Sequence, residues 1–143
     1  VLSRLVNGED RSTCILFGDG AGAAVVESRA DYPSLCACLG VRGEEKILNI
    51  PGTNTGRPSL IHMEGTAVFK FAVETVPQCM DAVLAKAGLG VEDVDLFVFH
   101  QANARIIDLV AKKYHIPPEK YPKNIERYGN TSAASIMASM IFT

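Results

Sequence analysis

The chain has 143 residues, of which 48% are apolar and 21% are charged, and its formal net charge is −2. This composition is that of a globular protein with enough length for one hydrophobic core. The near-neutral charge excludes a strongly basic nucleic-acid binder, and no apolar run approaches the roughly 20 residues of a membrane-spanning helix. The 4 cysteines lack the spacing of a zinc site, which favours a reduced, cytoplasmic protein without a metal.

The first elements predicted are two strands on either side of a glycine-rich turn. A short tail with a turn at residues 7–10 leads into a strand at 13–17, and Gly18-Asp19-Gly20-Ala21-Gly22 follows. These glycines approach the dinucleotide-binding fingerprint, but that fingerprint requires a helix to begin at the glycines. Residues 23–27 instead predict a second strand. The glycines are therefore predicted to serve close backbone packing rather than phosphate binding.

The middle of the chain predicts little regular structure. Residues 31–40 form a loop with an apolar patch, and residues 43–46 form a solvated turn. Pro51, Gly52 and Gly56 indicate an irregular connection over residues 47–56. His62 lies in a loop-like context and is predicted to be a surface residue, as is His115.

From Thr66 onward, helices are predicted to alternate with short strands. Apolar residues at helical spacing predict a helix that ends at Gly88, with a kink or break at Pro77. An apolar run predicts a strand at 94–99; a helix follows Asn103, a strand covers 123–127, and a last helix begins at Ser132. This alternation predicts a parallel α/β sheet.

Both ends of the chain suggest a piece of a longer protein. It starts at Val1 without an initiator methionine and stops at Thr143 inside a helical pattern that has no C-cap signal. At least one further strand is expected after the last helix.

The polar residues that suggest chemistry are His100 and Asn130. His100 directly follows the strand at 94–99, and ligands in open α/β sheets gather at the carboxyl ends of strands. Asn130 comes thirty positions later in a Gly-Asn-Thr-Ser turn. The two side chains together could donate to one developing oxyanion, or belong to a Cys-His-Asn nucleophilic arrangement. The alternative is that His100 is a structural hydrogen-bonding residue.

The second predicted helix carries three cations. Arg105 and Lys112 are seven positions apart and share a face, and Lys113 lies beside it. This surface is either an ordinary solvated helix face or a patch that attracts an acidic partner.

Three motifs carry a resemblance to a known family. They are His-Gln-Ala-Asn-Ala-Arg-Ile-Ile at 100–107, Tyr-Gly-Asn-Thr-Ser-Ala-Ala-Ser-Ile at 128–136 and Phe-Gly-Asp-Gly-Ala-Gly-Ala-Ala at 17–24. Together they resemble the β-ketoacyl-acyl-carrier-protein synthase III family. The resemblance implies a thiolase-like layered α/β/α fold of two similar halves, usually in a homodimer. Residues 1–50 would end the N-terminal half and residues 51–143 would form the C-terminal half, truncated in its last helix. The fold would be incomplete, without the nucleophile-bearing N-terminal part and the final strands.

The resemblance also implies an acyltransferase that starts type II fatty-acid synthesis. Such enzymes move an acyl group from acyl-CoA onto a cysteine and condense it with malonyl-acyl-carrier protein, releasing carbon dioxide and using no further cofactor. His100 and Asn130 would be the His and Asn of the catalytic triad. Lining the pantetheine tunnel would be Gly65, Phe69, Ala102 and Asn103, with Arg11 near the CoA adenine. The carrier-protein surface would comprise Lys70, Gln101, Arg105, Lys112 and Lys113.

The cysteines depart from the family pattern. The family's nucleophile lies at the start of a buried helix, where the helix dipole favours the thiolate, and none of Cys14, Cys36, Cys38 and Cys79 has that setting. The chain alone is therefore predicted to be inactive in condensation and marginally stable. Two alternatives remain: a related starter-condensing enzyme of polyketide or alkylquinolone pathways, and a non-catalytic remnant that binds a carrier protein or another subunit.

Overall fold

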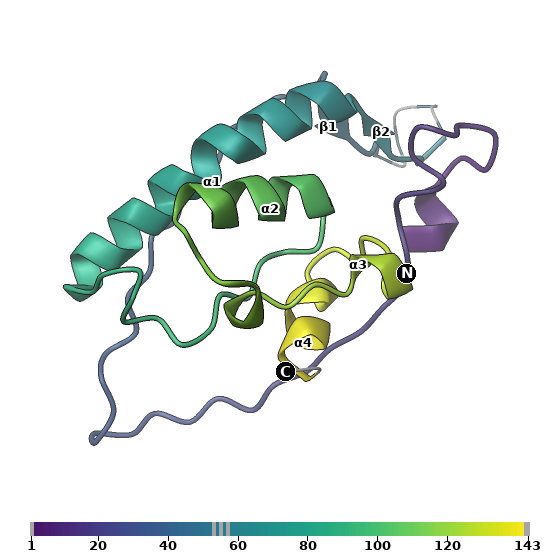
Figure 1. Ribbon diagram of the computed structural model, residues 1–143. Coiled ribbons are helices and arrows are strands. Elements are labelled where there is room, and N and C mark those ends of the chain that lie inside the picture. Colours follow the sequence, from purple (N-terminus) through teal and green to yellow (C-terminus); the bar gives the residue numbers. More distant parts are fainter. Residues whose placement is uncertain (1, 53, 55, 57, 142–143) are drawn as a thin grey trace.

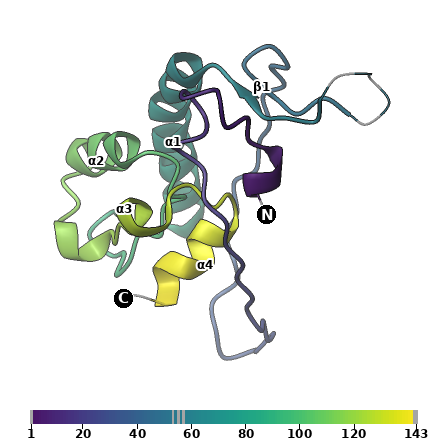
Figure 2. The same cartoon turned by 90° about the vertical axis from the view of Figure 1, so that its right-hand side faces the viewer.

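The computed structural model describes residues 2–52, 54, 56 and 58–141. Four α-helices dominate this part of the chain, and α1 and α2 lie alongside each other above the shorter α3 and α4 (Figure 1). The segment that follows the glycines loops away from the helices in both views (Figures 1 and 2). In chain order the elements are η1 (Leu2–Leu5), β1 (Leu48–Asn49), β2 (His62–Met63), α1 (Gly65–Ala87), α2 (Ala104–Lys113), η2 (Pro118–Lys120), α3 (Ile125–Tyr128) and α4 (Ala134–Ile141).

Helix α1 confirms the helix predicted from Thr66 to Gly88. It ends where Gly88 adopts the left-handed conformation, with φ of 69°, and the Leu89 N–H donates to the Leu84 carbonyl at 3.1 Å. A residue without a Cβ adopts this conformation without steric cost, which explains the position of the glycine. Of the kink or break predicted at Pro77, the break does not occur: the helix continues through this residue, which is buried. Packing of an apolar face outweighs the single lost backbone donor.

Helix α2 confirms the helix predicted after Asn103. The Asn103 side-chain oxygen accepts from the Arg105 N–H at 2.9 Å, which satisfies one of the donors left open at a helix start. Ile107, Val110 and Ala111 are buried. Helix α2 packs against α1, and the Tyr114 hydroxyl at its end lies 2.6 Å from an Asp81 carboxylate oxygen of α1.

The predicted strands are wrong as hydrogen-bonded elements. Residues 13–17 form turns apart from a single bridge at Phe17, residues 23–27 and 94–99 have no regular structure, and residues 125–128 form α3 instead of a strand. In the described part of the chain, the one sheet is the antiparallel pair β1–β2, in which Leu48 faces Met63. It interrupts the connection predicted as irregular over 47–56. Apolar sequence favours an extended backbone, but a strand also needs a neighbour to complete its hydrogen bonds.

The glycine-rich segment packs closely against the chain around Asn130, as predicted. Phe17 and Asn130 form a parallel bridge, in which the Gly18 N–H donates to the Asn130 carbonyl at 3.0 Å and the Asn130 N–H to the Leu16 carbonyl at 2.8 Å. A Cβ at Gly18 would overlap the Tyr128 carbonyl oxygen. The glycines therefore allow two segments distant in sequence to meet at backbone distance.

The buried apolar core is small and centres on α2. It consists of Ile61, Ile107, Val110, Ala111 and Ile116. By contrast, Val25, Leu35 and Val41 are at least 94% exposed. No helix among the described residues is both long and apolar enough to cross a membrane.

Candidate functional site

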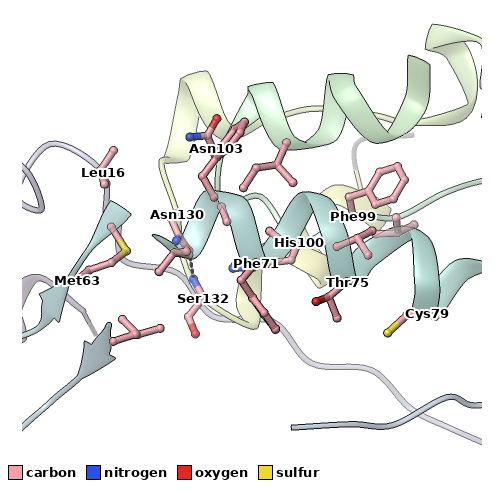
Figure 3. Close-up of a pocket in the computed structure, with 18 of the residues that line it drawn as sticks. Leu16, Met63, Phe71, Thr75, Cys79, Phe99, His100, Asn103, Asn130 and Ser132 are labelled. Carbon is pink, nitrogen blue, oxygen red and sulfur yellow. Dashed lines mark hydrogen bonds between the residues drawn. The ribbon is translucent and has the colours of Figure 1, made fainter. Parts of the chain in front are cut away.

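A cavity with a volume of about 1210 Å³ lies along α1 (Figure 3). Its wall is mostly apolar, with Phe71 of α1 and Phe99 among the lining side chains. Four polar residues interrupt this wall near the start of α2 and the loop before α4: His100, Asn103, Asn130 and Ser132. A cavity with an apolar wall and a few grouped polar residues is the usual form of a small-molecule site.

His100 and Asn130 line this one cavity, although thirty positions separate them in the sequence. The irregular segment before α2 carries His100, and the loop between α3 and α4 carries Asn130. The bridge between Asn130 and Phe17 fixes that loop. The fold thus brings together the two residues that the sequence paired.

The His100 imidazole contacts the helix behind it as well as the cavity. Its Nδ1 lies 2.7 Å from the Ser135 hydroxyl of α4. His100 is exposed as a whole residue, but the protein around the ring desolvates it in part and lowers the pKa of His100 below its ordinary value, while a hydrogen bond with the Ser132 backbone acts in the opposite direction. At neutral pH the imidazole is therefore uncharged, with one protonated and one unprotonated nitrogen.

The Asn130 side chain is oriented by its own loop. Its oxygen accepts from the Ser132 N–H at 2.9 Å, a contact visible in Figure 3. Ser132 has a left-handed backbone with φ of 56°, an uncommon conformation for a residue other than glycine. Because the side-chain oxygen is engaged, the Nδ2 group is the part of the amide that remains for a ligand.

The residues predicted to line the tunnel also meet at this cavity. Gly65 and Phe69 contribute from α1, and Ala102 and Asn103 contribute from the turn before α2. The guanidinium carbon of Arg105 lies 5.6 Å from the centre of the Phe69 ring, so a cation packs on the cavity wall. Arg11 does not line the cavity and is exposed in the turns before Phe17.

Gln101 requires a correction as a surface residue. Its exposed fraction is 0%, and its amide nitrogen donates to the Phe99 carbonyl at 3.0 Å and the Pro122 carbonyl at 3.3 Å. Its amide oxygen accepts from the Asn124 N–H at 3.1 Å. The side chain is turned inward because it satisfies buried backbone groups, so it offers nothing to a partner on the surface.

The cations predicted to bind a carrier protein are all exposed. Lys70 lies on α1 beside a smaller cavity of about 400 Å³, while Arg105, Lys112 and Lys113 lie on α2. Among the residues that the structure describes, none of these four forms an ion pair with a carboxylate.

The acidic residue on the same helix does have a partner. Asp108 pairs with Lys123 at 2.6 Å, and this hydrogen bond raises the pKa of Lys123. The carboxylate is thereby neutralised, and the exposed face of α2 keeps its positive charge.

Sequence reasoning missed Ser132 and Ser135. Both lie in the Asn-Thr-Ser-Ala-Ala-Ser motif that follows Gly129, three positions apart. Only Ser135 lies in α4, and Ser132 precedes the helix with a left-handed backbone, so helical spacing gave no signal that relates the two. Neither serine stands out by residue type, because serine is common near helix starts as a capping residue.

Comparison with known proteins agrees with this geometry. The family described as 3-oxoacyl-[acyl-carrier-protein] synthase III matches residues 1–43, and the C-terminal part of the same synthase matches residues 84–141. A crystal structure of the synthase III from Aquifex aeolicus VF5 superposes with a TM-score of 0.88 at 45% identity, covering 99% of this chain and 45% of that chain. The fold is therefore a partial thiolase-like α/β fold, as predicted.

Curated relatives point to the same family. The β-ketoacyl-[acyl-carrier-protein] synthase III of Clostridium acetobutylicum is 42% identical over 95% of this chain and 45% of its own length. That of Symbiobacterium thermophilum is 43% identical over 98% of this chain and 46% of its own length. The chain belongs to the 3-oxoacyl-[acyl-carrier-protein] synthase III family and spans less than half the length of these relatives.

Proposed function

We propose that this chain is part of a β-ketoacyl-acyl-carrier-protein synthase III, an acyltransferase that condenses an acyl-CoA starter with malonyl-acyl-carrier protein. The observation that carries the proposal is the convergence of His100 and Asn130 on one apolar cavity. An uncharged imidazole and an amide present N–H donors there without adding charge. Such donors act most strongly on an oxygen that becomes negative in a water-poor site.

In the proposed reaction the two donors act during decarboxylation. The bond between the malonyl carboxylate and the adjacent carbon breaks, carbon dioxide leaves, and the electron pair moves into a thioester enolate. His100 and Asn130 hold the enolate oxygen. The enolate carbon then attacks the carbonyl carbon of the acyl group, which a cysteine carries as a thioester. The new carbon–carbon bond forms and the cysteine sulfur is released. Donors that bind the enolate better than the starting thioester lower the barrier.

The cysteine is not assigned to this chain. Cys79 lies inside α1, Cys36 and Cys38 lie in irregular chain, and Cys14 lies in a turn. None begins a helix, where a thiolate would be stabilised. We therefore propose that these 143 residues alone do not carry out condensation.

The partners follow from the charge and the cavity. Arg105, Lys112 and Lys113 form an exposed cationic face on α2, suited to an acidic carrier protein. The cavity beside them would take the pantetheine arm and the acyl-CoA starter.

The alternative function is that of a related starter-condensing enzyme. A priming β-ketosynthase of the R1128 polyketide pathway superposes with a TM-score of 0.86 at 35% identity, covering 97% of this chain and 44% of that chain. The curated synthase III relatives have higher identity, which favours the synthase III function. The homodimer implied by the family resemblance stays a prediction.

The test uses the full-length protein that contains this chain, with malonyl-acyl-carrier protein and radiolabelled acetyl-CoA. His100→Ala and Asn130→Ala should each lower decarboxylation and condensation by about 10²–10³-fold, the usual effect of removing one oxyanion donor. The control is His62→Ala, since His62 is an exposed histidine that does not line the large cavity. Unchanged decarboxylation in both site variants would overturn the proposal, and condensation by the 143 residues alone would overturn the assignment of the cysteine elsewhere.

A further inference from the structure

A cluster of buried polar side chains lies behind His100 and has no role in the function proposed above. It consists of Gln101, Asn124, Ser135 and Ser139, none of which is more than 6% exposed. None of the four lines the cavity. Buried polar groups must be paired to be tolerated, so their hydrogen bonds reveal which atoms donate and which accept.

The Ser135 hydroxyl sits where this cluster meets the site. Its oxygen accepts from the Gln101 backbone N–H at 3.1 Å and lies 2.7 Å from His100 Nδ1. A hydroxyl has one proton to donate. Among the residues that the structure describes, the Nδ1 atom is the one partner found that can accept this proton.

We propose that Ser135 is a positioning residue, which donates its hydroxyl proton to His100 Nδ1 and thereby holds the imidazole in the form protonated at Nε2. The neutral ring has one protonated nitrogen, so an Nδ1 that accepts leaves Nε2–H as the donor. This inference rests on the proposed function, in which His100 must donate to the enolate oxygen. The opposite tautomer would present a lone pair at Nε2 and repel that oxygen.

Desolvation of His100 favours the neutral ring, which is the state the serine requires, and it outweighs the hydrogen bond with the Ser132 backbone, which raises the pKa. No Asp, Glu, Lys or Arg lines the cavity among the described residues, and the other titratable groups in its wall are the thiols of Cys36, Cys38 and Cys79. On the other side, Ser132, Gln101 and Ser135 offer only uncharged partners. Donation from a hydroxyl to the unprotonated nitrogen also favours the neutral ring, in the same direction as its desolvation.

Ser139 provides a matched control within the same helix. It is as buried as Ser135, with 1% exposure for each, and lies one turn further along α4. Its hydroxyl donates to the Ser135 carbonyl at 2.9 Å and accepts from the Asn124 amide at 3.3 Å. No hydrogen bond joins it to His100, so Ser139→Ala removes a buried hydroxyl without touching the imidazole.

The first test is ¹⁵N NMR of the histidine side chains in the 143-residue chain, which has 3 histidines, with His100→Gln to assign the signal. We expect a protonated Nε2 and an accepting Nδ1. Ser135→Ala should move population toward the Nδ1–H form, raise the His100 pKa toward its ordinary value and shift the Gln101 amide proton upfield. Ser139→Ala should leave the His100 signals in place. A dominant Nδ1–H form in the unmodified chain, or equal shifts in both serine variants, would overturn the proposal.

If the alanine variant does not fold, Ser135→Cys replaces it in the test. This variant keeps most of the side-chain volume, but its thiol donates weakly, so it should move the His100 signals in the direction expected for Ser135→Ala. The same labelling in the full-length protein links the tautomer to turnover. There Ser135→Ala should slow malonyl decarboxylation by about tenfold, less than the loss of a whole oxyanion donor. If His100→Ala leaves decarboxylation unchanged, the proposed function fails, while the tautomer spectra still decide the role of Ser135.

Discussion

Replacing Gln101 by methionine tests whether the buried amide holds the site in place. The amide makes three hydrogen bonds to backbone groups of Phe99, Pro122 and Asn124, at 3.0, 3.3 and 3.1 Å. Each neutral bond contributes about 1 kcal/mol net, and methionine has a similar volume without the polar atoms. We expect Gln101→Met to lower the free energy of unfolding by about 3 kcal/mol, a large part of the 5–15 kcal/mol typical of a domain.

The assay is urea unfolding followed by circular dichroism, with Lys112→Met as the control. Lys112 is exposed on α2, and its replacement should change the free energy of unfolding by about 0.5 kcal/mol or less. A loss below about 1 kcal/mol in Gln101→Met would show that water or rearranged chain replaces the amide bonds, and would refute the structural role assigned to this residue.

Three further predictions address other parts of the molecule. Desolvation and the hydrogen bond to Asp81 raise the pKa of Tyr114 to about 12, so ultraviolet titration should find one tyrosine that ionises late and Tyr114→Phe should abolish that signal. The pKa of His100 in the folded chain lies below its ordinary 6.5, so the unfolded chain binds the proton more tightly. The free energy of unfolding should therefore fall as pH drops below about 6.5. Thermal melts of His100→Gln should show a weaker dependence of stability on pH in this range. In the full-length protein, Arg105→Glu should raise KM for malonyl-carrier protein but not for acetyl-CoA, and the effect should shrink with added salt because exposed charges are screened.

The helices were predictable because their signals are local. Apolar spacing predicted α1 and α2, and Gly88 and Asn103 marked where α1 ends and α2 begins. The effect of Pro77 was not predictable in the same way. Its ring removes one backbone donor from α1, but whether the helix breaks depends on packing against the rest of the molecule, which no local pattern contains.

The strands were not predictable from their apolar runs. Residues 94–99 have the composition of a buried strand, yet among the described residues the Phe97 N–H bonds to the Lys120 carbonyl, at 2.8 Å, and no ladder forms. Strand formation depends on a partner at the right distance and register, which lies elsewhere in sequence. Close backbone packing at the glycines was predictable, since a missing side chain has few other uses in such a run.

The sequence motifs identified residues that line one cavity, but not the direction in which every side chain points. The motifs at 100–107 and 128–136 led to His100 and Asn130, and both line the cavity. The same motif placed Gln101 on the surface, whereas its side chain is buried. Ser135 was overlooked because its importance comes from one contact of 2.7 Å across the fold. Neighbours in sequence share a motif but can face opposite sides of the chain.

The loop and helix at the C-terminal end of the described chain position both donors of the proposed site. The loop before α4 carries Asn130 and orients its amide through Ser132, while α4 itself holds the His100 ring through Ser135. The glycine-rich segment fixes this unit from the other side through Gly18. Because both side chains contact this one short stretch, a constant spacing of the two donors depends on it. Two N–H groups that act on a single enolate oxygen need that constancy, since hydrogen-bond strength falls steeply when distance or angle departs from the optimum.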